Sequence, residues 1–175
     1  MPLDADPAQA LPDAAAALSV TALDTPIGRL ALHWRGARDA GALTRVVLAA
    51  DDLEAPMAPP WLAAAFAVYF RDPGQAIDLP VRLAGTPFQQ RVWQAIAAIP
   101  PAATRTYGEL AAALGSSARA VGGACRANPC PLVVPCHRVV ARHGLGGFAG
   151  DLDGRLLAIK RLLLAHEGQG PRLTP

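Results

Sequence analysis

The segment that leads into Cys136 restricts the fold of this chain more than any other, because an apolar run meets a proline, a cysteine and a histidine there. Residues 132–134 are short, rich in β-branched side chains and bounded by prolines, so they predict the end of a buried core strand. Pro135 fixes the backbone angle φ and holds Cys136 at that end. His137 places an imidazole next to the sulfur, which favours the thiolate near neutral pH. A buried structural cysteine beside a surface histidine fits the same residues, since free cysteine often fills a core.

Composition indicates a soluble protein with reduced thiols. The 175 residues suit one domain or two small ones. No apolar run approaches the ~18 residues that a membrane helix needs. Residues 1–17 are acidic, rich in alanine and proline, and lack the basic start of a signal peptide, so we expect a disordered tail and a cytoplasmic protein. Three cysteines in such a chain predict thiols rather than a disulfide framework.

The charge is divided unevenly between the two halves of the chain. Residues 1–80 carry five Lys and Arg against ten Asp and Glu, a net charge of −5. Residues 81–175 carry eleven against four, a net charge of +7. A basic half joined to an acidic half predicts a nucleic-acid-binding face confined to the C-terminal part. A solvated surface biased towards arginine would give the same distribution.

The first half of the sequence predicts a small antiparallel sheet with one helix. Residues 29–34 alternate like a strand after a turn, and residues 43–48 predict a second strand. Residues 61–70 place apolar side chains at helical spacing. Residues 77–84 predict a strand or a linker, and the boundary between the halves falls near residues 84–85.

The second half predicts several helices. Thr86 and Pro87 begin an amphipathic helix that ends at residues 100–101. Thr106 caps a short helix over residues 107–114, and Ser116 or Ser117 caps another that runs to about Arg126. Two short helices joined by a glycine-containing turn are typical of a helix-turn-helix. A final amphipathic helix covers residues 156–164.

The second of these short helices carries an unusual set of small residues. Gly122 and Gly123 each destabilise a helix by roughly 1 kcal/mol relative to alanine. Their presence in this helix therefore needs an explanation. One reason is tight packing inside the protein. The other is close approach to DNA, because a minor groove only ~6 Å wide accepts a flat helix face. Arg119 is the one long side chain on this face that could then reach into the base stack.

Several segments of the chain, in order, resemble the methylated-DNA–protein-cysteine methyltransferases, also called 6-O-alkylguanine-DNA alkyltransferases. The resemblance runs from about Thr25 to Gly168 and is dense from Gly85 onwards. The segments that carry it are Thr106–Ala111, Arg119–Ala124, Asn128–Pro129, Pro135–Val139 and Leu164–Gly168. Five matched segments in the right order make a chance similarity improbable.

The resemblance implies a mixed fold of the α/β (α+β) class. It assigns residues 18–84 to a small RNase-H-like domain with an antiparallel sheet. It assigns residues 85–168 to a mostly helical DNA-binding and catalytic domain with a winged-helix-like helix-turn-helix. Residues 1–17 and 169–175 are then tails.

The resemblance also assigns chemical roles to individual residues. Cys136 is the alkyl acceptor, and His137 is its general base through a water. Glu167 orients His137, although a carboxylate at a helix end is more often solvated. Asn128 braces the turn that carries the cysteine. Tyr107 donates toward N3 of the departing guanine and helps to rotate the flipped nucleotide.

The implied partner is double-stranded DNA containing alkylated guanine, bound through its minor groove by a monomer with no membrane contact. Base flipping brings the lesion to the thiol, and one molecule repairs one lesion without a metal or organic cofactor. The DNA-binding residues would be Tyr107, Ala118, Arg119, Ala120, Gly122 and Arg126. The substrate pocket would include Phe148, the backbone carbonyl of Val139 and the backbone amide of Ala149.

The sequence departs from the family pattern in the pocket loop. Phe148-Ala149-Gly150-Asp151 stands where members often have Tyr-Ser or Tyr-Ala followed by two glycines, and residues 151–158 are a few residues longer than usual.

Three other functions fit parts of the sequence. A non-enzymatic sensor of alkyl lesions would keep the DNA-binding parts, but such sensors replace the acceptor cysteine. A cysteine hydrolase fits Cys, His and Glu but leaves the glycine-rich helix unexplained. A metal site could draw on Cys125, Cys130, Cys136, His137 and His143, whose spacing matches no common zinc pattern.

Overall fold

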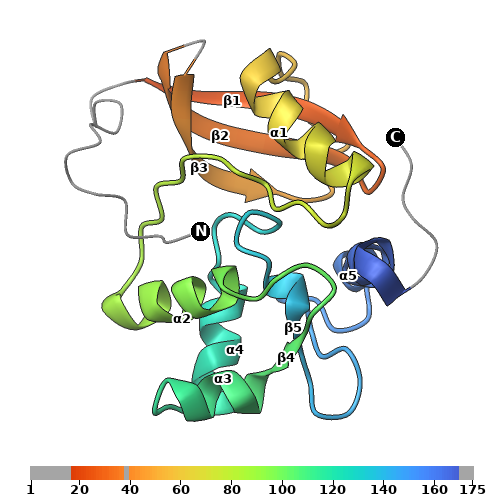
Figure 1. The fold of residues 1–175 in the computed structure, drawn as a ribbon. Helices are drawn as coiled ribbons and strands as arrows, with labels where there is room; N and C mark the ends of the chain where they lie inside the picture. The colour runs from red at the N-terminus through yellow and green to blue at the C-terminus, as the bar shows by residue number, and fades with distance from the viewer. Residues whose placement is uncertain (1–16, 38–39, 170–175) are drawn as a thin grey trace.

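The computed structural model describes residues 17–37 and 40–169, and its first half is an antiparallel sheet with a helix across one face (Figure 1). The strands pair in the order β1-β2-β3. The elements are β1 (Leu18–Thr25), β2 (Gly28–Ala37), β3 (Ala40–Val47) and α1 (Pro60–Arg71). The two predicted strands and the predicted helix are confirmed, and β1 is an additional strand that the sequence reading did not identify.

The second half is mostly helical, as predicted (Figure 1). Its regular elements are α2 (Pro87–Ala97), β4 (Arg105–Thr106), α3 (Tyr107–Ala113), α4 (Ala118–Arg126), β5 (Val139–Val140) and α5 (Arg155–Leu164). The short strands β4 and β5 pair in parallel. The chain then continues from α5 into a π-helical turn, η2 (Ala165–Gln169). None of the helices in the described ranges is both long and apolar enough to cross a membrane.

Side-chain caps explain where α2, α3 and α4 begin. Thr86 and Gln89 form a reciprocal capping box at the start of α2. Thr106 and Glu109 form another at the start of α3, with the Glu109 carboxylate 2.7 Å from the Thr106 amide. Ser117, rather than Ser116, caps α4. The local hydrogen bonds of these short polar residues therefore set the helix-turn-helix, α3 and α4, as the sequence predicts.

The predicted core strand at residues 132–134 is wrong. These residues form a turn in which the Val134 amide donates to the Cys130 carbonyl over 2.9 Å. Leu132 has a positive φ of 76°, which lies outside the strand region for a residue other than glycine. The stretch 129–135 contains three prolines, and a proline has no N–H to give to a strand ladder. Cys136 consequently starts a short 3₁₀ turn, η1 (Cys136–Arg138), directly after this loop.

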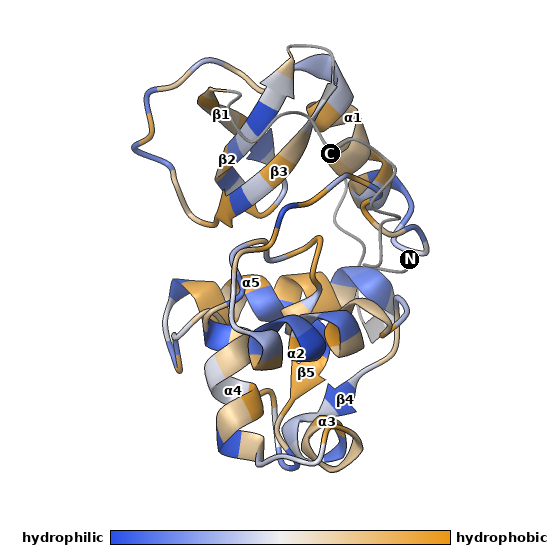
Figure 2. Ribbon diagram, turned by 90° about the vertical axis from the view of Figure 1, so that its left-hand side faces the viewer, coloured by the Kyte–Doolittle hydropathy of each residue, from blue (hydrophilic) through white to orange (hydrophobic). Residues whose placement is uncertain are grey.

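Buried apolar side chains form one continuous cluster through both halves. Figure 2 shows the apolar strand β5 among the helices of the second half. The halves are also tied by the Val46 amide, which donates to the Pro129 carbonyl over 2.9 Å, and by an ion pair between Asp51 and Arg155. Strand β3 of the first half therefore directly contacts the loop that leads to Cys136.

Candidate active site

Cys136 lies at a cavity of about 270 Å³, slightly below the usual range of small-molecule sites. The wall comes from α3, α4, η1 and the loop that follows β5. The lining residues are Tyr107, Gly122, Cys125, Arg126, Cys136 and residues 147–152. Six of the predicted site residues therefore lie around one cavity. They are Tyr107, Gly122, Arg126, Cys136, Phe148 and Ala149.

The Cys136 thiol is buried and held by Asn128. The Asn128 side-chain amide donates to Cys136 Sγ over 3.2 Å and to the Val134 carbonyl over 2.8 Å. Its carbonyl oxygen accepts from the Cys130 amide over 3.0 Å, which closes the turn. Burial raises the pKa of Cys136, and the hydrogen bond from Asn128 and the charge of Lys160 offset only part of this. The resting group is therefore a thiol, which needs a base to become a nucleophile.

The His137 imidazole is held in one orientation by Glu167. Its Nε2 lies 2.8 Å from Glu167 Oε1 in a fully buried environment. Burial lowers the pKa of His137, although the hydrogen bond to Glu167 opposes this, so the imidazole is neutral near pH 7. An ionised carboxylate only accepts hydrogen bonds, so the proton of the neutral ring sits on Nε2. Nδ1 then carries a lone pair, and it has no hydrogen-bond partner within the described residues.

Glu167 is a buried carboxylate with four short donor contacts, not a solvated one. Besides His137, Oε1 accepts from Tyr69 Oη at 2.8 Å and Arg138 Nη2 at 2.8 Å, and Oε2 accepts from Arg138 Nε at 2.9 Å. Burial alone would raise its pKa, but the hydrogen bonds from His137 and Arg138 lower the pKa of Glu167 to about 2. The carboxylate is ionised throughout the physiological range.

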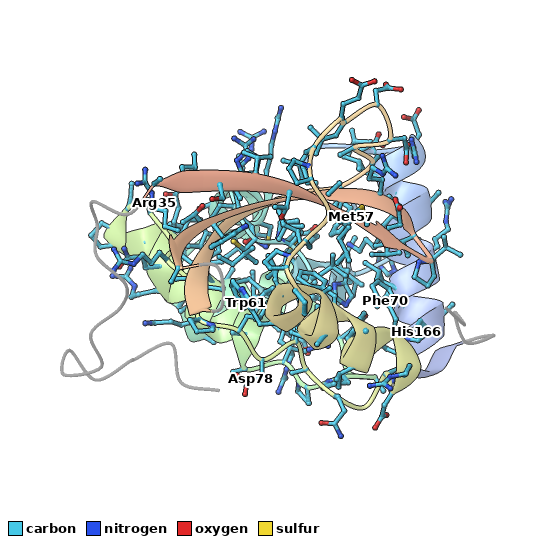
Figure 3. The ribbon with its side chains drawn as sticks, turned by 90° about the horizontal axis from the view of Figure 1, so that it is seen from above. Arg35, Met57, Trp61, Phe70, Asp78 and His166 are labelled. Atoms are coloured by element: carbon cyan, nitrogen blue, oxygen red, sulfur yellow. The ribbon has the colours of Figure 1, made fainter. Side chains whose placement is uncertain are left out.

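Tyr69 and Arg138 are site residues that the sequence reading missed. Arg138 belongs to the Pro-Cys-His-Arg-Val motif, but the motif itself does not indicate that its side chain is buried. A buried arginine needs a charged partner, and here that partner is Glu167. Tyr69 comes from α1, 98 residues from Glu167 in sequence, and no local pattern links the two. His166 Nε2 also lies 3.1 Å from the Tyr69 carbonyl, and its ring lies beside Phe70 (Figure 3). The first half of the chain therefore takes part in building the site.

Replacing Tyr69 with phenylalanine is expected to lower the free energy of unfolding by about 1.5–3 kcal/mol, because the hydroxyl donates to a buried charge. Phenylalanine keeps the ring contacts with Phe70 and His166. Urea unfolding at pH 7 measures the change. Thr44→Val is the matched control, since it deletes a hydroxyl that donates to the neutral His33 carbonyl over 3.0 Å. A Tyr69→Phe effect no larger than that of the control would contradict the contact with Glu167.

The pocket loop places two of the three predicted pocket residues at the cavity. Phe148 and Ala149 line it, and Ala149 has a positive φ of 49°. Val139 is fully buried and is not among the lining residues. Tyr107 lines the cavity, and its hydroxyl donates to the Gly147 carbonyl over 3.2 Å. Burial raises the pKa of Tyr107 to about 12, so it remains a proton donor at neutral pH.

The lengthened segment that follows is organised by Asp151. Its carboxylate accepts from the amides of Gly154 over 2.9 Å and Leu156 over 3.0 Å, which starts α5. Its backbone pairs with Phe148 in an isolated antiparallel bridge. The extra residues are therefore a capped turn at the rim of the cavity.

Helix α4 presents a flat, exposed surface next to the cavity. Ala118, Arg119 and Arg126 are exposed, and Ala120 is half-buried. A Cβ atom added at Gly122 or at Gly123 would meet nothing within 4 Å. Tight internal packing, one of the two explanations that the sequence left open, is therefore excluded for both glycines.

The cysteines and histidines do not form a metal site. Within residues 17–37 and 40–169, no three His, Cys, Asp or Glu side chains gather closely enough to hold an ion. Cys125 and Cys130 are buried free thiols, and burial raises the pKa of each to about 12. His143 is exposed.

Comparison with known proteins places this site in a family. A family model described as "6-O-methylguanine DNA methyltransferase, DNA binding domain" matches residues 87–169. The methylated-DNA–protein-cysteine methyltransferase of Salmonella typhimurium is 48% identical over 114 residues, which cover 63% of this chain and 64% of that protein. The chain thus spans slightly less than two thirds of the length of that relative.

Other relatives match over more of their length. The methylated-DNA–protein-cysteine methyltransferase of Mycobacterium leprae is 39% identical over 150 residues, 79% of this chain and 88% of the relative. A crystal structure of Mycobacterium tuberculosis OGT in complex with DNA superposes with a TM-score of 0.70 at 34% identity, covering 86% of this chain and 93% of that one. Together with the Cys136 site, these matches show that the chain belongs to the methylated-DNA–protein-cysteine methyltransferase family.

Proposed function

We propose that this protein repairs DNA by moving the alkyl group of a 6-O-alkylguanine onto Cys136. The observation that carries the proposal is the buried Cys136 thiol at a cavity, next to a neutral His137 whose Nε2 is held by Glu167. Family membership supports the same chemistry, and the DNA complex of the M. tuberculosis relative supports DNA as the partner.

The transfer step needs one base, one nucleophile and one acid. His137 Nδ1 takes the thiol proton through a bridging water, and Glu167 stabilises the resulting imidazolium. A bond forms between Cys136 Sγ and the alkyl carbon while the bond from that carbon to guanine O6 breaks. Tyr107 is the acid that donates its proton toward N3 of the departing base. The proton that His137 took from the thiol is returned through water to Tyr107, so the base leaves as neutral guanine and the protons balance. The thioether has no route back to a thiol, so each molecule acts once.

The lesion reaches Cys136 by rotating out of the duplex while α4 lies in the minor groove. Arg119 fills the gap in the base stack, and Ala118, Ala120 and Gly122 allow the helix to approach closely. Arg126 lies at the rim of the cavity, where a phosphate or the displaced strand would pass. Phe148 and the Ala149 amide, which line the cavity, contact the flipped base. Val139 does not line the cavity, and its carbonyl accepts from Lys160.

Replacing Gly122 with leucine is expected to change helix stability and DNA binding in opposite directions. A Cβ atom at this position meets nothing within 4 Å and leucine is a better helix former than glycine, so the free energy of unfolding should rise by up to about 1 kcal/mol. Affinity for an undamaged duplex should fall by tenfold or more, about 1.4 kcal/mol, because the flat face is lost. Fluorescence anisotropy with an undamaged duplex measures this without using the pocket.

Ala158→Leu is the matched control for Gly122→Leu, since it adds the same side chain at an exposed position of α5. This control should bind DNA as the wild type does. Unchanged DNA affinity in Gly122→Leu, with the helix folded, would show that α4 does not face the groove.

Incubation with a duplex that carries 6-O-methylguanine labelled in the methyl group tests the proposed function. Digestion and mass spectrometry then locate the label. One equivalent or less on the Cys136 peptide supports a single-turnover transfer. Repeated turnover with release of the label would point to hydrolysis, and tight binding of the duplex without transfer would point to a lesion sensor.

A further inference from the structure

Lys160 is a buried cation that the proposed reaction does not yet use. It lies on α5 with a fully buried side chain. Its Nζ donates to three backbone carbonyls, those of Val139 at 2.6 Å, Leu145 at 2.7 Å and Gly147 at 3.0 Å. Within the described residues no carboxylate lies within ion-pair distance of Nζ. An ammonium buried without a counter-ion is costly, and such groups are retained where they serve a site.

The three carbonyls join the strand after Cys136 to the loop that lines the cavity. Val139 begins β5, three residues after Cys136, while Leu145 and Gly147 belong to the pocket loop. The Gly147 carbonyl also accepts from the Tyr107 hydroxyl, and Lys160 Nζ lies 5.9 Å from the centroid of the Tyr107 ring. One side chain therefore sets the distance between the thiol, the pocket loop and the proposed acid.

The charges around the Cys136 thiol indicate a second effect of Lys160, on the thiol itself. Arg138 offsets the charge of Glu167, so the group of His137, Glu167 and Arg138 is neutral overall in its resting state. Lys160 is then the uncompensated charge that acts on Cys136.

The groups whose charge affects the pKa of Lys160 are the thiols of Cys136 and Cys125. The ring of Tyr107 also lies close to Nζ. Lys160 in turn acts on the imidazole of His137. Burial lowers the pKa of Lys160 to about 8, and negative charge on either thiol would raise it. The ammonium is thus more stable when Cys136 is a thiolate, and by reciprocity it stabilises that thiolate.

We propose that Lys160 is a positioning residue whose ammonium holds the pocket loop and stabilises the thiolate of Cys136. The proposal rests on the transfer function proposed above. In this proposal Lys160, on α5, supplies the positive charge that stabilises the thiolate. His137, stabilised by Glu167, takes the proton from the thiol.

Alkylation of Cys136 by iodoacetamide as a function of pH tests this assignment directly. Peptide mass spectrometry separates Cys136 from the other two thiols. In Lys160→Met the midpoint of the pH–rate curve should rise by at least about one unit, which lowers the rate near neutral pH by about tenfold. Lys160→Arg keeps the charge and should stay closer to the wild type. Arg161→Met, on the exposed side of α5, is the control and should leave the midpoint unchanged.

A purely structural role for Lys160 would lower the rate at every pH without moving the midpoint, and that result would overturn the proposal. Should Lys160→Met fail to fold, Lys160→Arg and Lys160→Gln provide the charged and neutral comparison, and equal midpoints in these two would overturn it as well. Transfer from labelled duplex is measured in parallel. A wild type that transfers no label refutes the proposed function, while the iodoacetamide curves still decide the role of Lys160.

Discussion

Replacing Cys136 with alanine is expected to abolish methyl transfer while leaving affinity for a 6-O-methylguanine duplex within a few-fold of the wild type. Transfer needs a nucleophile, and the sulfur is the only reacting atom that the substitution removes. Alanine is smaller than cysteine, so the cavity remains open to the base. Asn128 loses its contact with Sγ but keeps the 2.8 Å hydrogen bond to the Val134 carbonyl, so the loop should hold its conformation.

Labelled transfer and fluorescence anisotropy on the same duplex measure the two effects. Cys130→Ala is the matched control, because it removes another fully buried thiol that is not among the cavity-lining residues, and it should still accept the methyl group. Transfer that persists in Cys136→Ala would mean that another group accepts the alkyl chain. Cys125 is the candidate to check by mass spectrometry, since it also lines the cavity.

Replacing Arg138 with methionine is expected to lower the free energy of unfolding by about 3–5 kcal/mol, because a buried carboxylate is left without its cation. Arg138 makes two hydrogen bonds to Glu167 and a third, of 2.7 Å, to the Ile99 carbonyl. Urea unfolding at pH 7 measures the loss. Transfer should also fall sharply, because Glu167 would then hold His137 as a charged imidazolium and weaken it as a base.

The double variant Arg138→Met with Glu167→Gln separates charge from packing. Removing the carboxylate removes the uncompensated charge, so a large part of the stability should return while transfer stays low. If the double variant is as unstable as Arg138→Met alone, the loss comes from packing and not from the ion pair.

The stability of the wild type should also depend on pH through Glu167. Its pKa is about 2 in the folded protein, below the ordinary value of 4.5. The stabilisation from this group is therefore present above about pH 4.5 and is lost as the pH falls toward 2. In Arg138→Met the folded-state pKa of Glu167 should rise, so the same loss should occur at a higher pH.

Local sequence was a good guide to the helices around the site and a poor one to the loop that carries the thiol. Thr86 and Thr106 were recognisable as caps because a capping box involves residues only three apart. The run 132–134 looks like a strand by composition, and its turn depends on bonds that composition does not show. The Val134 amide donates a hydrogen bond to the Cys130 carbonyl, and the Asn128 side-chain amide donates one to the Val134 carbonyl.

The sequence alone determined the order of the helices, the caps Thr86 and Thr106 and the Cys136-His137 pair, because each depends on neighbours a few residues away along the chain. The tertiary structure decided that Glu167 is buried and that Tyr69 and Arg138 hold it. It also decided that Lys160 meets three carbonyls and, among the residues that the structure describes, no carboxylate. Those contacts join residues 13 to 98 positions apart. The pKa of a group depends on what surrounds it in space, so the protonation states of Cys136, His137 and Glu167 follow only from the folded structure.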